Sequence, residues 1–224
     1  MAEYLQGIAV AARGVPVTLI ISLVAVMGGL VIGLLVAIAK RSKYRVLRGL
    51  ATIYVDVLRG TPLLVQVLIL AYGVPQIIRS VTDVQFNWEH MIIVGFIACG
   101  INSSAYMAEI IRSGLQAVDI GQTEAARSLG LSSSQTMRYI IVPQAFKIIV
   151  PALGNEFVTL IKETSILSVA GIVEVTRRGT LWASSSFLSF QAYIGVAIVY
   201  LIMTLTLSRL VAYIERRLAQ SDRG

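Results

Sequence analysis

The sequence predicts an all-α membrane protein with five transmembrane helices. Hydrophobic residues make up 56% of its 224 residues and charged residues only 14%, against roughly 25% charged residues in soluble domains. Apolar windows of about 18 residues or more, the length needed to cross a bilayer, recur along the chain. A soluble domain of this composition would expose large apolar patches. Ordinary soluble enzymes, disordered chains and disulfide scaffolds are therefore excluded.

The five spans follow from the positions of the charges. Three apolar windows are free of charge, at 14–39, 91–108 and 179–208. Two further apolar stretches, at about 49–78 and about 146–170, contain charged residues. Neither of these two is long enough for two spans, so each is assigned one span.

The basic residues predict the orientation of the chain. Thirteen Lys and Arg follow the first, third and fifth spans, and four lie in the segments on the other side. Because Lys and Arg collect in cytoplasmic loops, we expect the N-terminus outside and the C-terminus in the cytoplasm. The expected organisation is a single transmembrane domain at 15–218, followed by a cytoplasmic tail at 219–224.

The first 14 residues predict a short amphipathic helix on the outer membrane face. Leu5, Ile8, Ala9 and Ala12 follow the i, i+3, i+4, i+7 spacing of one helix face. No signal peptide is expected, because positions 1–13 have no basic n-region and the first apolar stretch is too long.

Neither a metal site nor a nucleotide site is expected on this chain. Cys99 is the single cysteine and His90 the single histidine, so neither has the partners that a metal site requires. The sequence also has no phosphate-binding loop of the G-x-x-x-x-G-K-[ST] type. No catalytic residue is therefore assigned.

The longest polar segment, about 113–144, contains the start and stop signals of two short helices. A helix is expected at 122–129, and Gly130 follows it as a residue free to adopt positive φ. Ser132 and Gln135 form a capping box for a second helix, and Pro143 is expected to end that helix. The segment is either a simple connection between spans or a docking surface for a cytoplasmic partner.

Two sequence motifs resemble those of a known protein family. Glu124-Ala125-Ala126, followed by Gly130 and later by Pro143, resembles the EAA loop of bacterial ABC importer permeases. The residue before the proline is Val142, where this pattern usually has leucine. The stretch 59–66, which reads Arg-Gly-Thr-Pro-Leu-Leu-Val-Gln, resembles the signature of polar amino acid permeases of the histidine/glutamine/arginine type.

The resemblance implies a type I ABC importer permease fold in the bacterial plasma (inner) membrane. It implies a second permease copy, identical or homologous, two cytoplasmic ATPase subunits and an extracytoplasmic amino-acid-binding protein. ATP and Mg would be bound by the ATPase subunits, so this chain needs no cofactor and is not itself an enzyme. By this resemblance, the residues that couple the chain to the ATPase are Glu124, Ala125, Ala126 and Gly130.

Polar residues inside the spans are candidates for substrate contact, because such residues are costly in lipid and by default functional. A zwitterionic amino acid needs hydrogen-bond donors for its carboxylate and acceptors for its ammonium. The expected substrate-binding residues are Asn102, Glu163, Thr164, Ser103, Thr61, Asp56 and Glu156.

The balance of interior charges predicts a basic substrate. Four interior acids, Asp56, Glu109, Glu156 and Glu163, outnumber the interior cations Arg59 and Lys162. The excess favours arginine, lysine or histidine. The alternative is glutamine or glutamate in a transporter of the same type.

Several alternative interpretations stay open at this stage. Arg59 could neutralise Asp56 or Glu156, and Arg112 could neutralise Glu109, which would leave those acids structural. The motif at 29–33, Gly-x-x-x-Gly, is expected to be a helix contact within the subunit. An ion-coupled transporter or channel and a membrane enzyme are distant alternatives. Neither would explain the structured cytoplasmic loop, and the sequence has no nucleophile–base pair.

Overall fold

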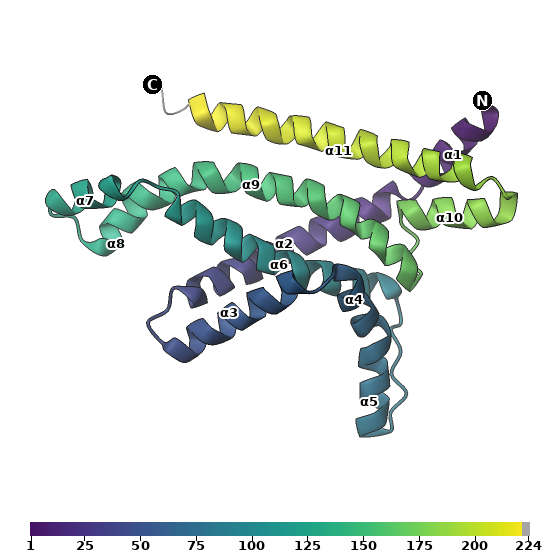
Figure 1. Ribbon diagram of the computed structural model, residues 1–224, viewed down its shortest axis with the longest axis horizontal. Helices are drawn as coiled ribbons and strands as arrows, with labels where there is room; N and C mark the ends of the chain where they lie inside the picture. The colour runs from purple at the N-terminus through teal and green to yellow at the C-terminus, as the bar shows by residue number, and fades with distance from the viewer. Residues whose placement is uncertain (221–224) are drawn as a thin grey trace.

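The computed structural model describes residues 1–220, with side chains described up to residue 218, and every element in that part of the chain is helical. Four long helices run roughly along one axis: α2 (Val15–Lys40), α6 (Met91–Gln116), α9 (Val142–Glu163) and α11 (Ser189–Gln220) (Figure 1). The start of α1 (Ala2–Ala12) and the end of α11 lie at opposite ends of this axis (Figure 1), as an odd number of spans requires. The shorter α-helices are α3 (Arg45–Gly60), α4 (Leu63–Leu68), α5 (Val74–Thr82), α7 (Ile120–Ser128), α8 (Ser133–Thr136) and α10 (Val175–Ser186).

Five helical segments within the described residues are long and apolar enough to cross a membrane, which confirms the predicted number. Their bounds are Ala2–Lys40, Leu63–Thr82, Met91–Gln116, Ser133–Ala170 and Ser189–Leu218. The second and fifth differ from the predicted windows, because each of those windows contains a break.

The predicted span at 49–78 is not one helix. It breaks at Thr61, which is extended at φ −118° and ψ 142° and directly precedes Pro62. A residue before proline is pushed out of the α region, so α3 ends there. Helix α3 runs back along α2, whereas α4 and α5 turn across the direction of the long helices (Figure 1).

The predicted span at 179–208 is also divided. Phe187 has φ 59° and ends α10, and α11 begins at Ser189. At the other end of α10, the buried Glu174 caps the helix by accepting hydrogen bonds from the N–H groups of Thr176 and Arg177. Burial raises the pKa of Glu174, and a hydrogen bond from the Tyr200 hydroxyl at 2.6 Å opposes that rise.

Pro143 does not end a helix, contrary to the prediction. A π-helical turn (η2, Met137–Ile141) precedes it, and Pro143 lies in the first turn of α9. The N–H of Val142 reaches back five residues to the carbonyl of Met137. This wider turn carries the helix past the proline, since a proline has no N–H and its ring crowds the preceding turn. The same device (η1, Ile69–Gly73) precedes Pro75 in α5.

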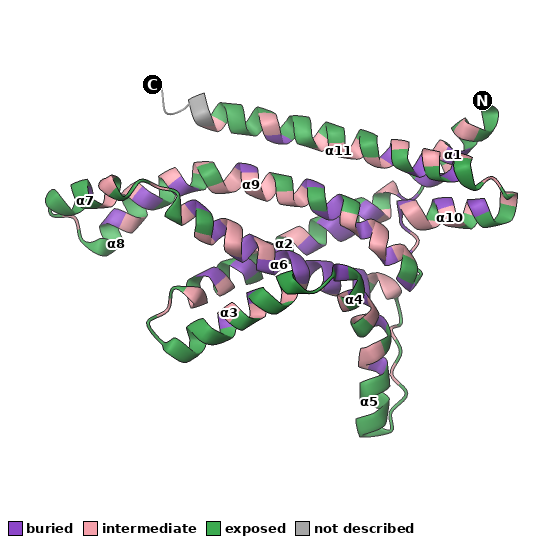
Figure 2. Ribbon diagram, viewed as in Figure 1, coloured by how far each residue is buried: buried purple, intermediate pink, exposed green. Residues whose placement is uncertain are grey.

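The packing of α2 against α6 forms the centre of the fold, where buried residues concentrate (Figure 2). Gly29 and Gly33 lie at this contact, which confirms the predicted helix contact within the subunit. A Cβ atom on Gly33 would lie 2.8 Å from the backbone oxygen of Ser104 and 2.9 Å from Cβ of Met107. The two backbones can therefore approach this closely only because position 33 has no side chain.

The N-terminal helix α1 packs on α10 and α11. Its buried residues are Gly7 and Ala11, whereas Leu5 in the predicted apolar stripe is 62% exposed. The predicted stripe is therefore divided: Ile8 packs against the core with Ala11, whereas Leu5, Ala9 and Ala12 are exposed. Helix α11 continues through Gln220, so the predicted tail at 219–224 falls on residues whose side chains are not described.

We predict that Gly33→Ala destabilises the chain by about 1–3 kcal/mol, because the added methyl group meets rigid backbone and overpacks the helix contact. Gly28→Ala is the matched control, since a Cβ atom at Gly28 meets nothing within 4 Å. Thermal unfolding of the detergent-solubilised protein measures both. Equal unfolding temperatures for the two variants would contradict the proposed tight contact.

Candidate functional site

Side-chain amides satisfy the backbone carbonyl that is freed at the break between α3 and α4. Proline 62 cannot donate to the carbonyl of Leu58, four residues earlier. The Gln66 side-chain amide donates instead to that carbonyl at 2.9 Å and to the Thr61 hydroxyl at 2.9 Å. Asn102 on α6 donates to the Gln66 side-chain oxygen at 3.1 Å and to the Leu58 carbonyl at 3.4 Å. A backbone carbonyl exposed at membrane depth is thereby satisfied by protein.

A cavity of about 360 Å³ lies beside this break. Its polar lining comes from three helical segments and comprises Arg59, Thr61, Asn102, Tyr106 and Glu163. Three residues predicted to bind substrate, Thr61, Asn102 and Glu163, therefore meet at one cavity. Asn102 is only 3% exposed, and its amide donates to the Gln66 side chain.

The cavity has one cation and one anion in its lining. The side chain of Arg59 is 44% exposed, and its guanidinium lies over the Tyr106 ring at 5.3 Å. Its nearest carboxylate oxygen is that of Glu109, at 4.0 Å, which is at the outer limit of an ion pair. Glu163 is half-buried and makes no ion pair with a described residue. Both charges are therefore available to a ligand.

Glu109 is neutralised by its neighbours. It accepts hydrogen bonds from Arg112 at 2.9 and 2.7 Å, as the spacing predicted, and also from the ammonium group of Lys40 at the end of α2. The predicted pairs of Arg59 with Asp56 and with Glu156 are not formed, because every ion pair within the described residues involves Glu109. Glu109 thus ties α2 to α6.

Four predicted substrate-binding residues lie outside the lining of this cavity. Ser103 is buried and donates to Glu156 at 3.3 Å, while Glu156 lies within electrostatic range of Arg59 and Glu163. Thr164 is fully buried and donates to the carbonyl of Ile161. Asp56 is exposed on α3. Their contact with substrate stays a prediction.

The polar loop between α6 and α9 has the predicted local structure. Helix α7 begins after Asp119, whose side chain accepts from the N–H of Gly121 at 2.7 Å. Gly130 has φ +83°, its N–H donates to Arg127, and the N–H of Leu131 donates to Ala126, which is the Schellman arrangement. The predicted capping box of Ser132 and Gln135 is present at the start of α8. The pair of helices lies at one end of the bundle (Figure 1).

The predicted coupling residues face in different directions. Glu124 and Ala125 are exposed, whereas Ala126 is 4% exposed and packs inside the loop. Ala126 therefore supports the pair of short helices, and Glu124 and Ala125 are the side chains presented to the surroundings.

The role of Gln66 was not among the predictions from the sequence. A signal was present, because Gln66 is the polar residue that lies one helical turn after Pro62 within an otherwise apolar run up to Ala71. A freed carbonyl in a membrane helix requires a donor, and this residue is placed to supply one. The bond between Lys40 and Glu109 had no such signal, since the two residues are 69 positions apart.

Residues 29–220 match the family described as binding-protein-dependent transport system inner membrane component. The chain is 40% identical over 204 residues to a probable glutamine ABC transporter permease protein, GlnM, of Bacillus subtilis (strain 168), with 91% of each chain covered. It is 36% identical over 210 residues to the arginine transport system permease protein ArtQ of the same organism, with 94% of this chain and 93% of the relative covered.

Among solved structures, one described as an amino acid ABC transporter with histidines superposes with a TM-score of 0.87 and 44% sequence identity. The match covers 93% of this chain and 94% of the other. An inward-facing structure of the MetNI methionine ABC transporter is 19% identical, with a TM-score of 0.71 over 93% of this chain and 96% of the other. This second likeness concerns the fold alone.

We predict that Gln66→Leu lowers the free energy of unfolding by about 1–3 kcal/mol, because the Leu58 carbonyl loses a partly buried hydrogen bond and Asn102 loses its Gln66 partner. Gln76→Leu on the exposed side of α5 makes the same chemical change as a control and is expected to have little effect. Thermal unfolding in detergent compares the variants. If Gln66→Leu were as stable as Gln76→Leu, the amide would not be needed to close the break.

Proposed function

We propose a substrate and a mechanism for this chain from the premise that it belongs to the family of binding-protein-dependent transport system inner membrane components. The chain is the membrane-spanning permease subunit of an amino acid ABC importer of the inner membrane. The ATPase of such an importer is a separate subunit, so this chain is not itself an enzyme. The proposal is that it carries a basic L-amino acid: arginine, lysine or histidine.

The observation that carries the proposal is that Arg59 and Glu163, a cation and an anion, line the same cavity. The guanidinium of Arg59 is suited to the α-carboxylate of an amino acid, because Arg binds carboxylates through two parallel hydrogen bonds. The carboxylate of Glu163 is suited to an ammonium group. A zwitterion therefore finds both of its partners in the same 360 Å³ space.

A basic side chain on the substrate requires a further acid. Glu109 is already paired with Lys40 and Arg112, so it is not one of the acids that are available to substrate. Glu156 is the remaining candidate near the cavity, since it lies within electrostatic range of Glu163 and Arg59. Burying this acid beside Glu163 is costly unless a cation joins them, which favours a substrate with two positive groups.

Glutamine is the second candidate. The GlnM relative, 40% identical, is named as a probable glutamine permease, whereas ArtQ is named for arginine. The pairing of Glu109 also makes the excess of free acids smaller than the sequence alone suggested. The two substrates differ in whether a second carboxylate must face the cavity.

The proposed mechanism is alternating access driven by two ATPase subunits, which hold the ATP and Mg. An extracytoplasmic binding protein delivers the amino acid, and the ATPases dock on the exposed Glu124 and Ala125 of each loop. Two identical permease copies are proposed, because one copy already contains both the loop and a complete cavity. Closure of the ATPases moves the loops, and the spans change from inward-facing to outward-facing.

We predict that ATP hydrolysis by the reconstituted complex with its binding protein is stimulated by arginine, lysine or histidine, and that Glu163→Gln weakens this stimulation. Loss of a charge-assisted hydrogen bond is worth about 1.5–3 kcal/mol, which raises the half-stimulating concentration roughly tenfold or more. Glu215→Gln, on an exposed part of α11, is the control.

A different result would overturn the substrate assignment. Stimulation by glutamine or glutamate alone, unchanged in Glu163→Gln, would contradict the basic substrate and leave Glu163 a structural residue. Stimulation by glutamine that is weakened in Glu163→Gln would support the cavity but replace the substrate with the second candidate.

We also predict that Glu124→Ala weakens binding of the ATPase subunits about tenfold, because an exposed carboxylate that bonds to the partner is lost. Ser134→Ala on the neighbouring helix α8 is the control, since its hydroxyl lies outside the capping box. Co-purification of the ATPase and the transport rate measure the effect. Unchanged co-purification and transport in Glu124→Ala would mean that Glu124 is not part of the docking surface.

A further inference from the structure

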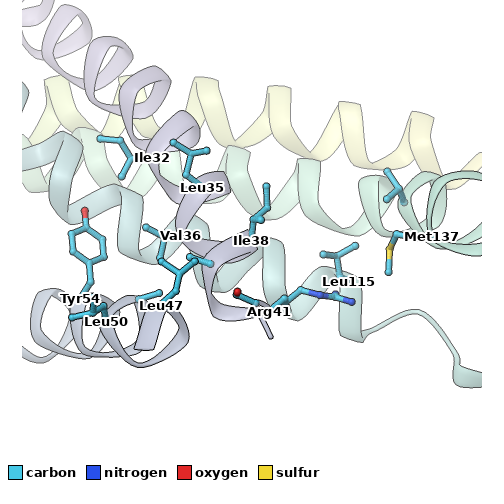
Figure 3. A pocket seen from close by; sticks show the side chains of 14 residues that line it. Ile32, Leu35, Val36, Ile38, Arg41, Leu47, Leu50, Tyr54, Leu115 and Met137 are labelled. Carbon is cyan, nitrogen blue, oxygen red and sulfur yellow. The ribbon is translucent and has the colours of Figure 1, made fainter. Parts of the chain in front are cut away.

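A large apolar groove lies away from the cavity beside Pro62, between the end of α2, α3, the end of α6 and the junction of η2 with α9 (Figure 3). Its volume is about 1010 Å³. The walls are formed chiefly by Ile32, Leu35, Leu50, Tyr54, Leu115 and Met137. Leu35 is 62% exposed and Leu50 is 61% exposed, so this chain by itself does not fill the groove.

The groove has the depth of one membrane leaflet. Along α2 it extends from Ile32 to Arg41, a separation of nine residues or about 14 Å at 1.5 Å per residue. The hydrocarbon core of a bilayer is about 30 Å thick, so a single leaflet spans about 15 Å. An acyl chain that begins at the level of Arg41 would therefore end near Ile32.

Positive charge gathers at one end of the groove. Arg41 lines it, and Figure 3 shows its side chain extending toward Leu115. Arg45 and Arg48 lie exposed in the first turn of α3, next to the wall residue Leu47. Within residues 1–220, none of these three arginines takes part in an ion pair, whereas Lys40 is paired with Glu109.

We propose that this groove binds an anionic phospholipid, with its acyl chains along the apolar walls and its headgroup at Arg41 and Arg45. Basic pockets between membrane helices are suited to anionic headgroups on the cytoplasmic side. A phospholipid is favoured over a second copy of this chain, because it matches both the leaflet length of the groove and the unpaired arginines at its end, and the experiment below separates the two occupants. The proposal does not depend on which amino acid is transported.

Native mass spectrometry of the complete complex, with its ATPase subunits and in detergent, tests the proposal. The complex is incubated with equal amounts of dioleoyl phosphatidylglycerol and dioleoyl phosphatidylcholine. We expect phosphatidylglycerol to be retained at least fivefold more than phosphatidylcholine. The double variant Arg41→Gln/Arg45→Gln should reduce that preference to less than twofold, because the charges that select the headgroup are lost.

A second variant tests the walls independently. Leu35→Trp places a bulky side chain in the groove and should lower retention of phosphatidylglycerol at least threefold. Val24→Trp, which changes another exposed residue of α2, and Arg216→Gln/Arg217→Gln, at the end of α11, are the controls. All variants are compared only after thermal unfolding confirms that they are folded.

Three results would each overturn the proposal. Equal retention of the two lipids would indicate ordinary contact with bulk lipid. Retention of neither lipid would indicate that another protein surface, including a second copy, covers the groove. An unchanged preference in Arg41→Gln/Arg45→Gln would place the selective site elsewhere on the complex.

Discussion

A membrane helix that breaks must find new partners for the backbone groups that it frees, and this constraint organises the structure around Pro62. In lipid, no water is available to satisfy the carbonyl of Leu58. Gln66 and Asn102 supply the donors from α4 and α6. The same bonds connect these two helices with the end of α3 and leave a polar cavity beside the break. The cavity is thus a consequence of satisfying the broken helix.

The arrangement of charges separates structural acids from acids that are free for function. Glu109 has three basic neighbours, of which Lys40 and Arg112 lie within hydrogen-bond distance. Glu163 has no ion-pair partner among the described residues and lines the cavity beside the break. Burial of an unpaired carboxylate is unfavourable, and such residues in membrane helices are by default functional. The distribution of partners, rather than the number of acids, therefore distinguishes the two roles.

The polar loop between α6 and α9 and the cavity share one helical segment. The segment Ser133–Ala170 begins at the capping box of α8, passes Pro143 through a π-helical turn and reaches Glu163. The helix therefore continues through Pro143 from the loop to the cavity, with Pro151 as the one proline in the interior of α9. The close packing of α2 on α6 at Gly33 gives this segment a rigid surface to move against.

Neighbouring residues were enough to predict the all-helical membrane class, the number of spans, the helix-ending glycine at Gly130 and the capping box at Ser132, because hydropathy and capping are local properties. The sequence also placed Thr61, Asn102 and Glu163 among the candidates that meet at the cavity. Local rules failed at Pro143 and within 179–208, where a π-helical turn and the capped helix α10 replaced the expected pattern. Only the tertiary structure decided that Lys40 pairs with Glu109 and that Asn102 closes a helix break, since these contacts join residues 69 and 36 or more positions apart. Contacts over such separations depend on how the helices pack, and no short segment of sequence encodes them.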